Sequence, residues 1–257
     1  LPPRLDAARL YQPWQRTARS FSVPARQPVV AVVVAGLGLT ADATEAAITL
    51  LPPEVTLSFT PYSHRLKDWI AMARIFGHEV MLDLPMEAPG AAEAIGPYGL
   101  TTAAAPSANL GRLDWILGRS GALVGVAGAY GQGFLGNPTA LRPVLAELRA
   151  RGLIFLDNAP GGHAASSALA ADLGLPFAAS DGKIDSGLAS RRVLDARLVQ
   201  AEDLALRRGS AVVMAEGLPV SIERIATWLL GLSERGVEVA PISAIARRNL
   251  MRWEVSG

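Results

Sequence analysis

The chain has 257 residues and a net charge of +1; half of its residues are apolar, and it contains no cysteine. This length suits one large α/β domain or two small ones, and the balanced charge argues against a dedicated nucleic-acid-binding protein. The lack of cysteine excludes disulfides, thiol nucleophiles and cysteine-ligated metals. No stretch reaches about 18 consecutive apolar residues, so the sequence predicts no transmembrane helix.

The composition changes after the first residues. Residues 1–27 are rich in arginine and proline, and we interpret them as an extended N-terminal arm. From residue 28 onward, strand and helix patterns alternate without an internal repeat or a linker. We therefore expect a single domain over residues 28–257, preceded by an arm that packs on it.

The clearest element is the run of small and β-branched apolar residues at 29–35, which predicts a strand buried on both faces. Gly36 and Gly38 follow it as a tight turn, and Thr40 is the expected N-cap of a helix that extends to Leu51. Further strands are expected at residues 55–59, 79–84, 123–127, 153–157, 176–179, 210–214 and 237–241.

Helices are expected between most of these strands. Their predicted ranges are 66–76, 107–117, 138–151, 164–173, 190–208, 219–235 and 242–249, and Asn137 is the predicted N-cap of the third. Alternating units predict a parallel sheet with right-handed crossovers. Both an open doubly wound sheet and a closed (β/α) barrel satisfy this pattern, and both place sites at the C-terminal ends of strands.

Two common site signatures are weak here. Residues 36–41 formally fit the dinucleotide-binding fingerprint, but the second strand ends in Phe59-Thr60-Pro61, without the acid that would bind a ribose. A plain tight turn is the better interpretation. The histidines His64, His78 and His163 lack the spacing of a zinc site, and His78, at the start of its strand, is expected to make a structural hydrogen bond.

Carboxylates gather at the expected C-terminal ends of strands. Asp83, Asp157 and Glu216 lie at or just past three strand ends, with Glu87, Asp181 and Asp185 close by. Carboxylates on this side of the sheet are suited to metal binding or acid–base chemistry. Alternatively, each of them caps a neighbouring helix or pairs with one of the many arginines.

Several segments resemble a known family. The most specific is Gly-His-Glu-Val-Met-Leu-Asp-Leu-Pro-Met-Glu at residues 77–87, and the others are residues 37–39, 55–62, 141–145 and 152–157. Together they resemble the divergent polysaccharide deacetylases, a bacterial envelope family. The resemblance implies an α/β fold, the deformed (β/α) barrel of the carbohydrate deacetylases, with about seven to eight mostly parallel strands.

The chain departs from this family where the chemistry should lie. The family's paired aspartates correspond to Ala35 and Gly36, its motif histidine to Ala129, and its Gly-His-Pro histidine to Glu216. The resemblance implies a divalent metal such as zinc, which needs about three protein ligands. Alanine and glycine side chains offer no lone pair, so we expect neither a bound metal nor another cofactor.

The sequence therefore favours a pseudoenzyme located in the periplasm or cell envelope over an active enzyme. Its retained cleft would bind a glycan, a peptidoglycan fragment or an envelope protein, with Tyr130 and Gln132 in place of the metal site. The residues expected at the cleft are Asp83, Glu87, Tyr130, Gln132, Asp157, Asp181, Asp185 and Glu216.

Two other interpretations remain open. One is an active carbohydrate hydrolase or deacetylase with a rebuilt site, in which Asp157 and Glu216 act as a carboxylate pair. The other is a structural or regulatory envelope protein that acts through its N-terminal arm and outer helices.

Overall fold

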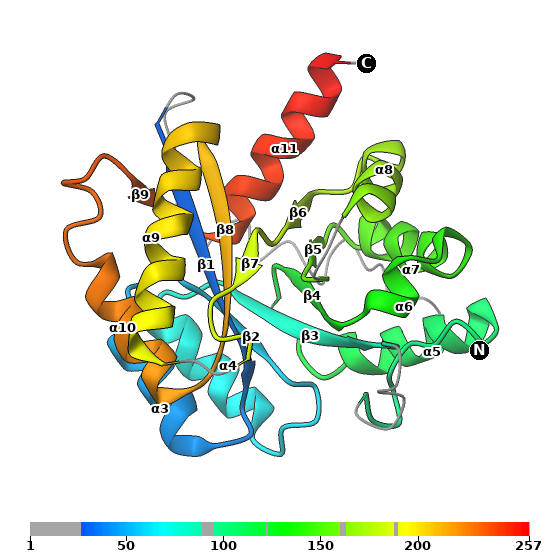
Figure 1. Cartoon of the computed structure of the whole chain (residues 1–257). Coiled ribbons are helices and arrows are strands. Elements are labelled where there is room, and N and C mark those ends of the chain that lie inside the picture. The colour runs from blue at the N-terminus through cyan, green and yellow to red at the C-terminus, as the bar shows by residue number, and fades with distance from the viewer. Residues whose placement is uncertain (1–26, 89–94, 122, 160–162, 188–189, 257) are drawn as a thin grey trace.

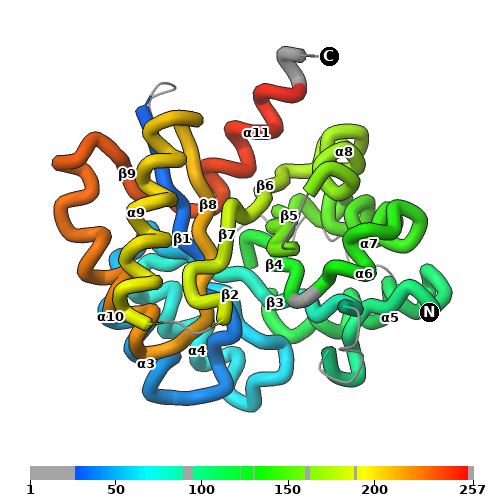
Figure 2. Tube along the Cα trace, in the orientation of Figure 1, coloured from blue at the N-terminus to red at the C-terminus, as the bar shows by residue number. Residues whose placement is uncertain are grey.

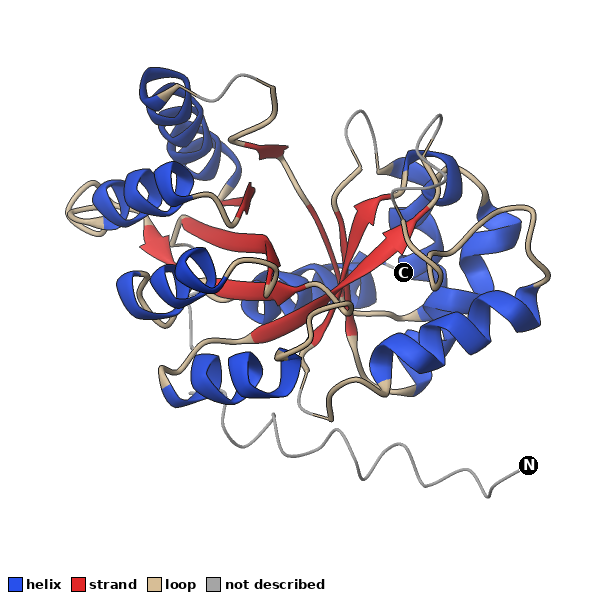
Figure 3. Cartoon of the chain, turned by 90° about the horizontal axis from the view of Figure 1, so that it is seen from below, coloured by secondary structure: helices blue, strands red, loops and turns tan. Residues whose placement is uncertain are grey.

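The computed structural model describes residues 27–88, 95–121, 123–159, 163–187 and 190–256. Within these residues, nine parallel strands form one curled sheet with helices around its outside (Figures 1 and 3). The strand order is β6-β5-β4-β3-β2-β1-β8-β7, and β9 also pairs with β1. The expected deformed (β/α) barrel of parallel strands is confirmed. Apart from Gln27, the expected N-terminal arm lies outside the described residues.

Strands and helices alternate as the sequence predicts. The strands are β1 (Val29–Leu37), β2 (Thr56–Phe59), β3 (Val80–Met86), β4 (Gly125–Tyr130), β5 (Ile154–Asp157), β6 (Phe177–Ala179), β7 (Gly182–Lys183), β8 (Ser210–Glu216) and β9 (Glu238–Val239). The helices are α3 (Ala41–Leu50), α4 (Leu66–Ile75), α5 (Pro106–Leu117), α6 (Gln132–Leu135), α7 (Pro138–Ala150), α8 (Ala164–Leu173), α9 (Arg191–Arg208), α10 (Pro219–Leu229) and α11 (Ile242–Ser256). None of the described helices is both long and apolar enough to cross a membrane.

Strand β1 lies in the interior of the sheet and pairs with β2, β8 and β9. Every side chain from Val29 to Val34 is buried, as expected for a strand covered on both faces. Strand β8 pairs with β1 without interruption, from Val29 opposite Ser210 to Ala35 opposite Glu216. This register sets the end of β1 beside the end of β8, where the candidate site lies.

One segment carries the chain from one edge of the sheet to the other. Strand β6 pairs with β5, but from Asp181 onward the same segment bonds to β8. The amide of Asp181 donates to the carbonyl of Val212 at 2.8 Å, and the amide of Ile184 donates to that of Met214 at 2.9 Å. No helix separates β6 from β7, whereas every other pair of consecutive described strands has one between them (Figure 2). Strand β7 was not predicted, because only two residues form it and they lack an apolar pattern.

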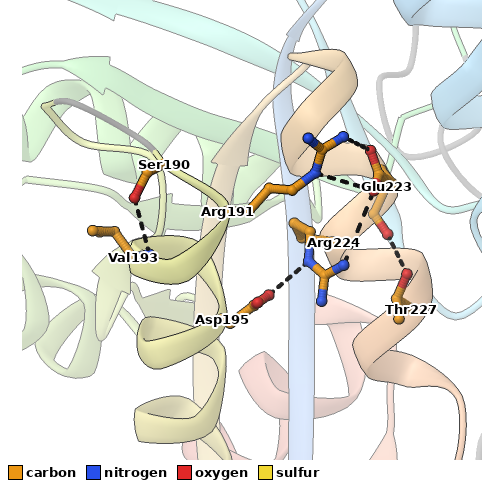
Figure 4. Close-up of polar contacts among 7 residues, drawn as sticks. All are labelled: Ser190, Arg191, Val193, Asp195, Glu223, Arg224 and Thr227. Atoms are coloured by element: carbon orange, nitrogen blue, oxygen red, sulfur yellow. Dashed lines mark hydrogen bonds and ion pairs between the residues drawn. The ribbon is translucent and has the colours of Figure 1, made fainter.

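Ion pairs join α9 to α10 on the outer surface (Figure 4). Arg191 contacts Glu223 at 2.7 Å, and Arg224 contacts Asp195 at 2.6 Å. Such exposed pairs each contribute only about 0–1 kcal/mol to stability. They nevertheless show which side of α9 is turned toward α10.

The turn after β1 differs in detail from the prediction. Thr40 occupies the N-cap position of α3, but its side chain makes no capping hydrogen bond. Instead, the hydroxyl of Thr44 accepts from the amide of Gly38 at 2.9 Å and donates to the carbonyl of Thr40 at 2.6 Å. The side chain that closes this turn thus comes from inside the helix.

Two other local predictions are confirmed. Asn137 caps α7, because its side-chain oxygen accepts from the amide of Ala140 at 3.1 Å. His78 is buried, and its ring nitrogens lie 2.9 Å from the carbonyl oxygen of Val55 and 3.0 Å from that of Ile48. His78 therefore ties two segments together at the N-terminal end of β3, away from the candidate site.

The ends of the last two helices were predicted incorrectly. Helix α10 ends at Leu229, not near Arg235, because Leu230 is extended and Gly231 has a φ of 73°. Helix α11 continues to Ser256, well beyond the predicted end at Asn249.

Candidate functional site

A pocket of about 520 Å³ lies at the C-terminal ends of β1, β3, β4 and β8, the side on which (β/α) folds place their sites. We call it the central pocket. Its volume is typical of sites for small ligands. The polar side chains that line it include Tyr62, Asp83, Gln132, Asn158, Lys183 and Glu216.

Asp83, on β3, is the buried acid of the central pocket. Its Oδ2 accepts from the amide of Gly36 at 3.0 Å, and its Oδ1 accepts from the hydroxyl of Ser58 at 2.6 Å. The pKa of the Asp83 carboxyl is raised from 3.8 to about 6, and burial is the largest cause of this shift. The hydrogen bond from Ser58 lowers this pKa, and the nearby charge of Glu216 raises it. Asp83 thus titrates close to neutral pH, a property common at functional sites.

Lys183 and Glu216 form an ion pair between the adjacent strands β7 and β8. Both side chains are partly exposed, at 33% and 42%. The backbone positions both, since Lys183 pairs with Met214 in the sheet and the amide of Glu216 donates to Asp185 Oδ2 at 2.7 Å. The pocket therefore holds one ammonium group near the two carboxylates of Asp83 and Glu216.

The backbone at Gly36 leaves room for Glu216. Gly36 has a φ of 69°, a conformation that side chains of L-residues rarely adopt. A Cβ atom there would clash with Oε2 of Glu216. A side chain at residue 36 and the observed position of Glu216 are therefore incompatible.

These residues do not fit a metal ion. The part of the chain that the structure describes contains no group of three histidine, cysteine or acidic side chains arranged to hold one. Asp83 already accepts two hydrogen bonds, and Glu216 is paired with Lys183. The ammonium of Lys183 would also repel a divalent cation placed beside it. The donor set thus disagrees with the zinc that the family resemblance implies.

The structure does not bring Asp157 into the central pocket. Asp157 is buried at the end of β5, and its oxygens accept from the amide of Ala159 at 2.8 Å and from the hydroxyl of Ser166. The ring of His163 lies 3.1 Å from the same carboxylate. Its neighbour Asn158 lines the pocket instead, so Asp157 and Glu216 do not share one pocket wall.

Glu87 and Asp185 hold the surrounding chain in place. Glu87 accepts from the amide of Thr102 at 2.6 Å and from its hydroxyl at 2.9 Å, and these bonds lower the pKa of the Glu87 carboxyl. Asp185 is buried and accepts from the hydroxyl of Ser221 at 2.8 Å as well as from the amide of Glu216. Asp185 therefore links the end of β8 to the first turn of α10.

The other three residues that were expected at the cleft, Gln132, Asp181 and Tyr130, do not share one location. Gln132 lines the central pocket. Asp181 lines a second pocket beside it. The side chain of Tyr130 lies outside the described part of the structure.

Sequence reasoning missed Lys183 and Tyr62, which both line the central pocket. The hydroxyl of Tyr62 donates to the carbonyl of Ile95 at 2.8 Å and accepts from the amide of Tyr98 at 3.2 Å, so this ring is held in position. One signal could have pointed to Lys183. It is one of two lysines, with Lys67, among 24 basic residues.

Comparisons with known proteins agree with this architecture. The model of the divergent polysaccharide deacetylase family matches residues 32–246. An uncharacterized protein from Agrobacterium tumefaciens C58 is 33% identical, with a TM-score of 0.84 over 91% of this chain and 94% of that one. No protein with a curated description matches the chain.

Two more distant solved structures share the fold. A peptidoglycan deacetylase from Bacillus subtilis is 12% identical, with a TM-score of 0.54 over 91% of this chain and 97% of that one. A mutant of a CE4-family pseudoenzyme with restored enzymatic activity is 12% identical, with a TM-score of 0.52 over 87% of this chain and 69% of that one. Because the family model matches most of its length, the chain belongs to the divergent polysaccharide deacetylase family.

Proposed function

We propose that this protein is a pseudoenzyme of its family that binds a glycan in the central pocket and acts in the periplasm or cell envelope. The observation that carries the proposal is the lysine in that pocket. The family resemblance implies a metal there, but the cationic group in the pocket is the ammonium of Lys183, paired with Glu216.

The lining of the pocket suits a sugar. Gln132 and Asn158 each offer a donor and an acceptor to hydroxyl groups. The ring of Tyr62 offers an aromatic surface on which the apolar side of a sugar ring can pack. The pair of Lys183 and Glu216 adds a charged donor and a charged acceptor side by side. Such a mixture of one apolar wall and a few placed polar groups is typical of small-ligand pockets.

The residues at the motif positions argue against the family's reaction. The resemblance assigns acids to Ala35 and Gly36 and a histidine to Ala129, and none of these side chains can bind a metal or move a proton. All three residues line the same pocket. We propose that the pocket is retained while the reactive groups that the resemblance implies are replaced.

Asp83 supports a second candidate, a metal-independent hydrolase. With a pKa of about 6, its carboxylate is available as a general base near neutral pH. In that reaction water would add to the carbonyl carbon of the acetamide while Asp83 accepts its proton, and Lys183 would stabilise the negative charge on the carbonyl oxygen. The protonated Asp83 would then return the proton to the nitrogen as the C–N bond breaks, which releases acetic acid and the amine. The earlier alternative, an Asp157–Glu216 pair, loses support because Asp157 does not line the pocket. Release of acetate from acetylated chitooligosaccharides by the wild type, abolished in Asp83→Asn, would favour the hydrolase.

A pocket-filling variant tests glycan binding. Ala129→Trp places a large ring in the central pocket, and Ala150→Trp, at an exposed position at the end of α7, is its control. Titration with N-acetylglucosamine oligomers is expected to give saturable binding to the wild type and to Ala150→Trp. Ala129→Trp is expected to bind at least tenfold more weakly. Equal binding by both variants, or no binding by the wild type, would overturn the proposal; the latter would favour a protein that acts through its outer surface.

A further inference from the structure

A second pocket, of about 510 Å³, lies beside the central one. We call it the seam pocket, because it lies where the chain crosses from β6 to β7 without a helix between them. Its polar side chains include His163, Ser180, Asp181, Lys183, Arg197 and Gln200. Asn158 and Lys183 line both pockets, so the two adjoin at these residues.

One side of helix α9 forms a wall of the seam pocket. Arg197, Gln200, Ala201 and Leu204 line it at the i, i+3, i+4 and i+7 spacing of a single helix face. Arg191 and Asp195 face α10 instead, as Figure 4 shows. No helix lies between β6 and β7 to cover the face of α9 that carries Arg197 and Gln200. This face therefore borders an open pocket and presents these two polar residues to it.

The charges around the seam pocket are balanced, with one exception. Three of its four ionisable side chains have an oppositely charged partner within 4.0 Å, namely Asp181 with Arg208, Lys183 with Glu216, and His163, when protonated, with Asp157. Among the described residues, Arg197 has no such partner. A guanidinium group that lines a pocket without a counter-ion favours an anionic ligand.

The position of Arg197 is fixed by the backbone. Its Nη1 donates to the carbonyl of Ile184 at 2.6 Å and to that of Ser186 at 2.9 Å. Within the described structure, the edge formed by Nε and Nη2 has no hydrogen bond. Such an edge matches the two oxygens of a carboxylate, which it binds through two parallel hydrogen bonds.

We infer that the seam pocket binds the carboxylate of an acidic sugar unit, with Arg197 as its recognition residue. This inference rests on the proposed function, since the acidic unit would belong to a glycan whose neighbouring unit occupies the central pocket. A carboxylate suits the site better than a phosphate dianion, because a single unpaired cation lines the pocket. The amide of Gln200, an exposed residue, is available for the hydroxyl groups of the same sugar.

Matched sugars and matched arginines test the inference. Glucuronic acid and glucose differ in the carboxylate, and both can be titrated into isotopically labelled protein while amide resonances are followed by NMR. Glucuronic acid is expected to shift the amides of Ile184 and Gln200, and glucose is not. Arg197→Gln is expected to weaken glucuronic acid binding at least tenfold, whereas Arg192→Gln, at an exposed position on the same helix, leaves it unchanged. Equal effects of the two sugars, or of the two variants, would overturn the inference, as would tighter binding of inorganic phosphate.

A second variant keeps the test decisive if Arg197→Gln unfolds. Gln200→Glu adds a negative charge to the pocket wall while Arg197 stays, and it too is expected to weaken glucuronic acid binding at least tenfold. The neutral N-acetylglucosamine oligomers report on the central pocket separately. Binding of these oligomers without glucuronic acid binding would refute the seam pocket alone. Glucuronic acid binding that depends on Arg197, without oligomer binding, would refute the glycan site of the central pocket alone.

Discussion

The carboxylate of Glu216 lies in the space that a side chain at residue 36 would need. The register of the sheet brings this about, because Ala35 on β1 pairs with Glu216 on β8. The family resemblance implies an aspartate at position 36, which is a glycine here, and the acid Glu216 enters the same space from the neighbouring strand. Gly36 and Glu216 are therefore linked sterically, and Lys183 completes the arrangement by pairing with Glu216.

This linkage predicts non-additive stability. Gly36→Ala is expected to lower the free energy of unfolding for two reasons. The φ of 69° costs a non-glycine residue about 1–2 kcal/mol. In addition, the new methyl group forces Glu216 away from Lys183. In a Glu216→Ala background only the backbone cost remains, so the loss should be smaller. Urea unfolding of the four proteins of this cycle measures the difference; strictly additive values would contradict the linkage.

Asp83 predicts a specific pH dependence of stability. Burial raises its folded-state pKa to about 6, above the value of 3.8 expected for the unfolded chain. The folded state therefore holds the proton more tightly, and this contribution to stability is complete at low pH and is lost as pH rises through about 6. At about 1.4 kcal/mol per pKa unit, the loss amounts to about 3 kcal/mol.

Asp83→Asn removes that titration. Its amide can donate to Ser58 and accept from the amide of Gly36, which keeps both hydrogen bonds. The stability of the variant relative to the wild type should therefore increase between about pH 4 and pH 7. Denaturant unfolding at several pH values gives this difference, and a constant difference would show that Asp83 titrates normally.

Two neighbouring charges predict opposite shifts at Asp83. The charge of Glu216 raises the pKa of the Asp83 carboxyl, and that of Lys183 lowers it. Glu216→Gln should therefore lower this pKa below about 6, and Lys183→Met should raise it. Lys67→Met, at an exposed position on α4, serves as the control. Carbon-13 NMR titration of the Asp83 carboxyl measures the shifts, and shifts of the same sign in both pocket variants would contradict the arrangement.

Two glycines outside the pocket predict contrasting effects on stability. A Cβ atom at Gly125, on β4, would overlap the carbonyl oxygen of Ile154 in the adjacent strand. Gly125→Ala is therefore expected to cost roughly 3 kcal/mol or more, because backbone atoms cannot move aside cheaply. Gly111, on α5, has no atom within 4 Å of a built Cβ, so Gly111→Ala should stabilise the helix by about 0.5–1 kcal/mol. Thermal unfolding of both variants tests the contrast, and similar melting temperatures would contradict it.

Much of the fold could be predicted because its signals are local. The apolar run at Val29–Val34 is buried on both faces as expected, and the asparagine before α7 caps it as expected. Strand β7 could not be predicted in this way. Its residues carry no strand pattern, and their extended conformation depends on bonds from Asp181 and Ile184 to β8, far away in the sequence.

The same distinction applies to the candidate site. Asp83 and Glu216 were identified because each was predicted at the end of an apolar strand, and both line the central pocket. Glu216 is the last residue of β8, whereas Asp83 lies in the middle of β3, which continues to Met86. Lys183 was missed because its strand was missed. Asp157 also ends a strand, but its carboxylate is held by Ala159 and Ser166, contacts that no sequence pattern reveals.

The central claim is that the pocket binds a glycan with the Lys183–Glu216 pair in place of a metal. The most direct test is calorimetric titration of N-acetylglucosamine oligomers into the wild type, first with EDTA and then with added zinc chloride. We predict the same saturable binding under both conditions, and no stoichiometric uptake of zinc. Binding that appears only with zinc, or one tightly bound zinc per chain, would contradict the account.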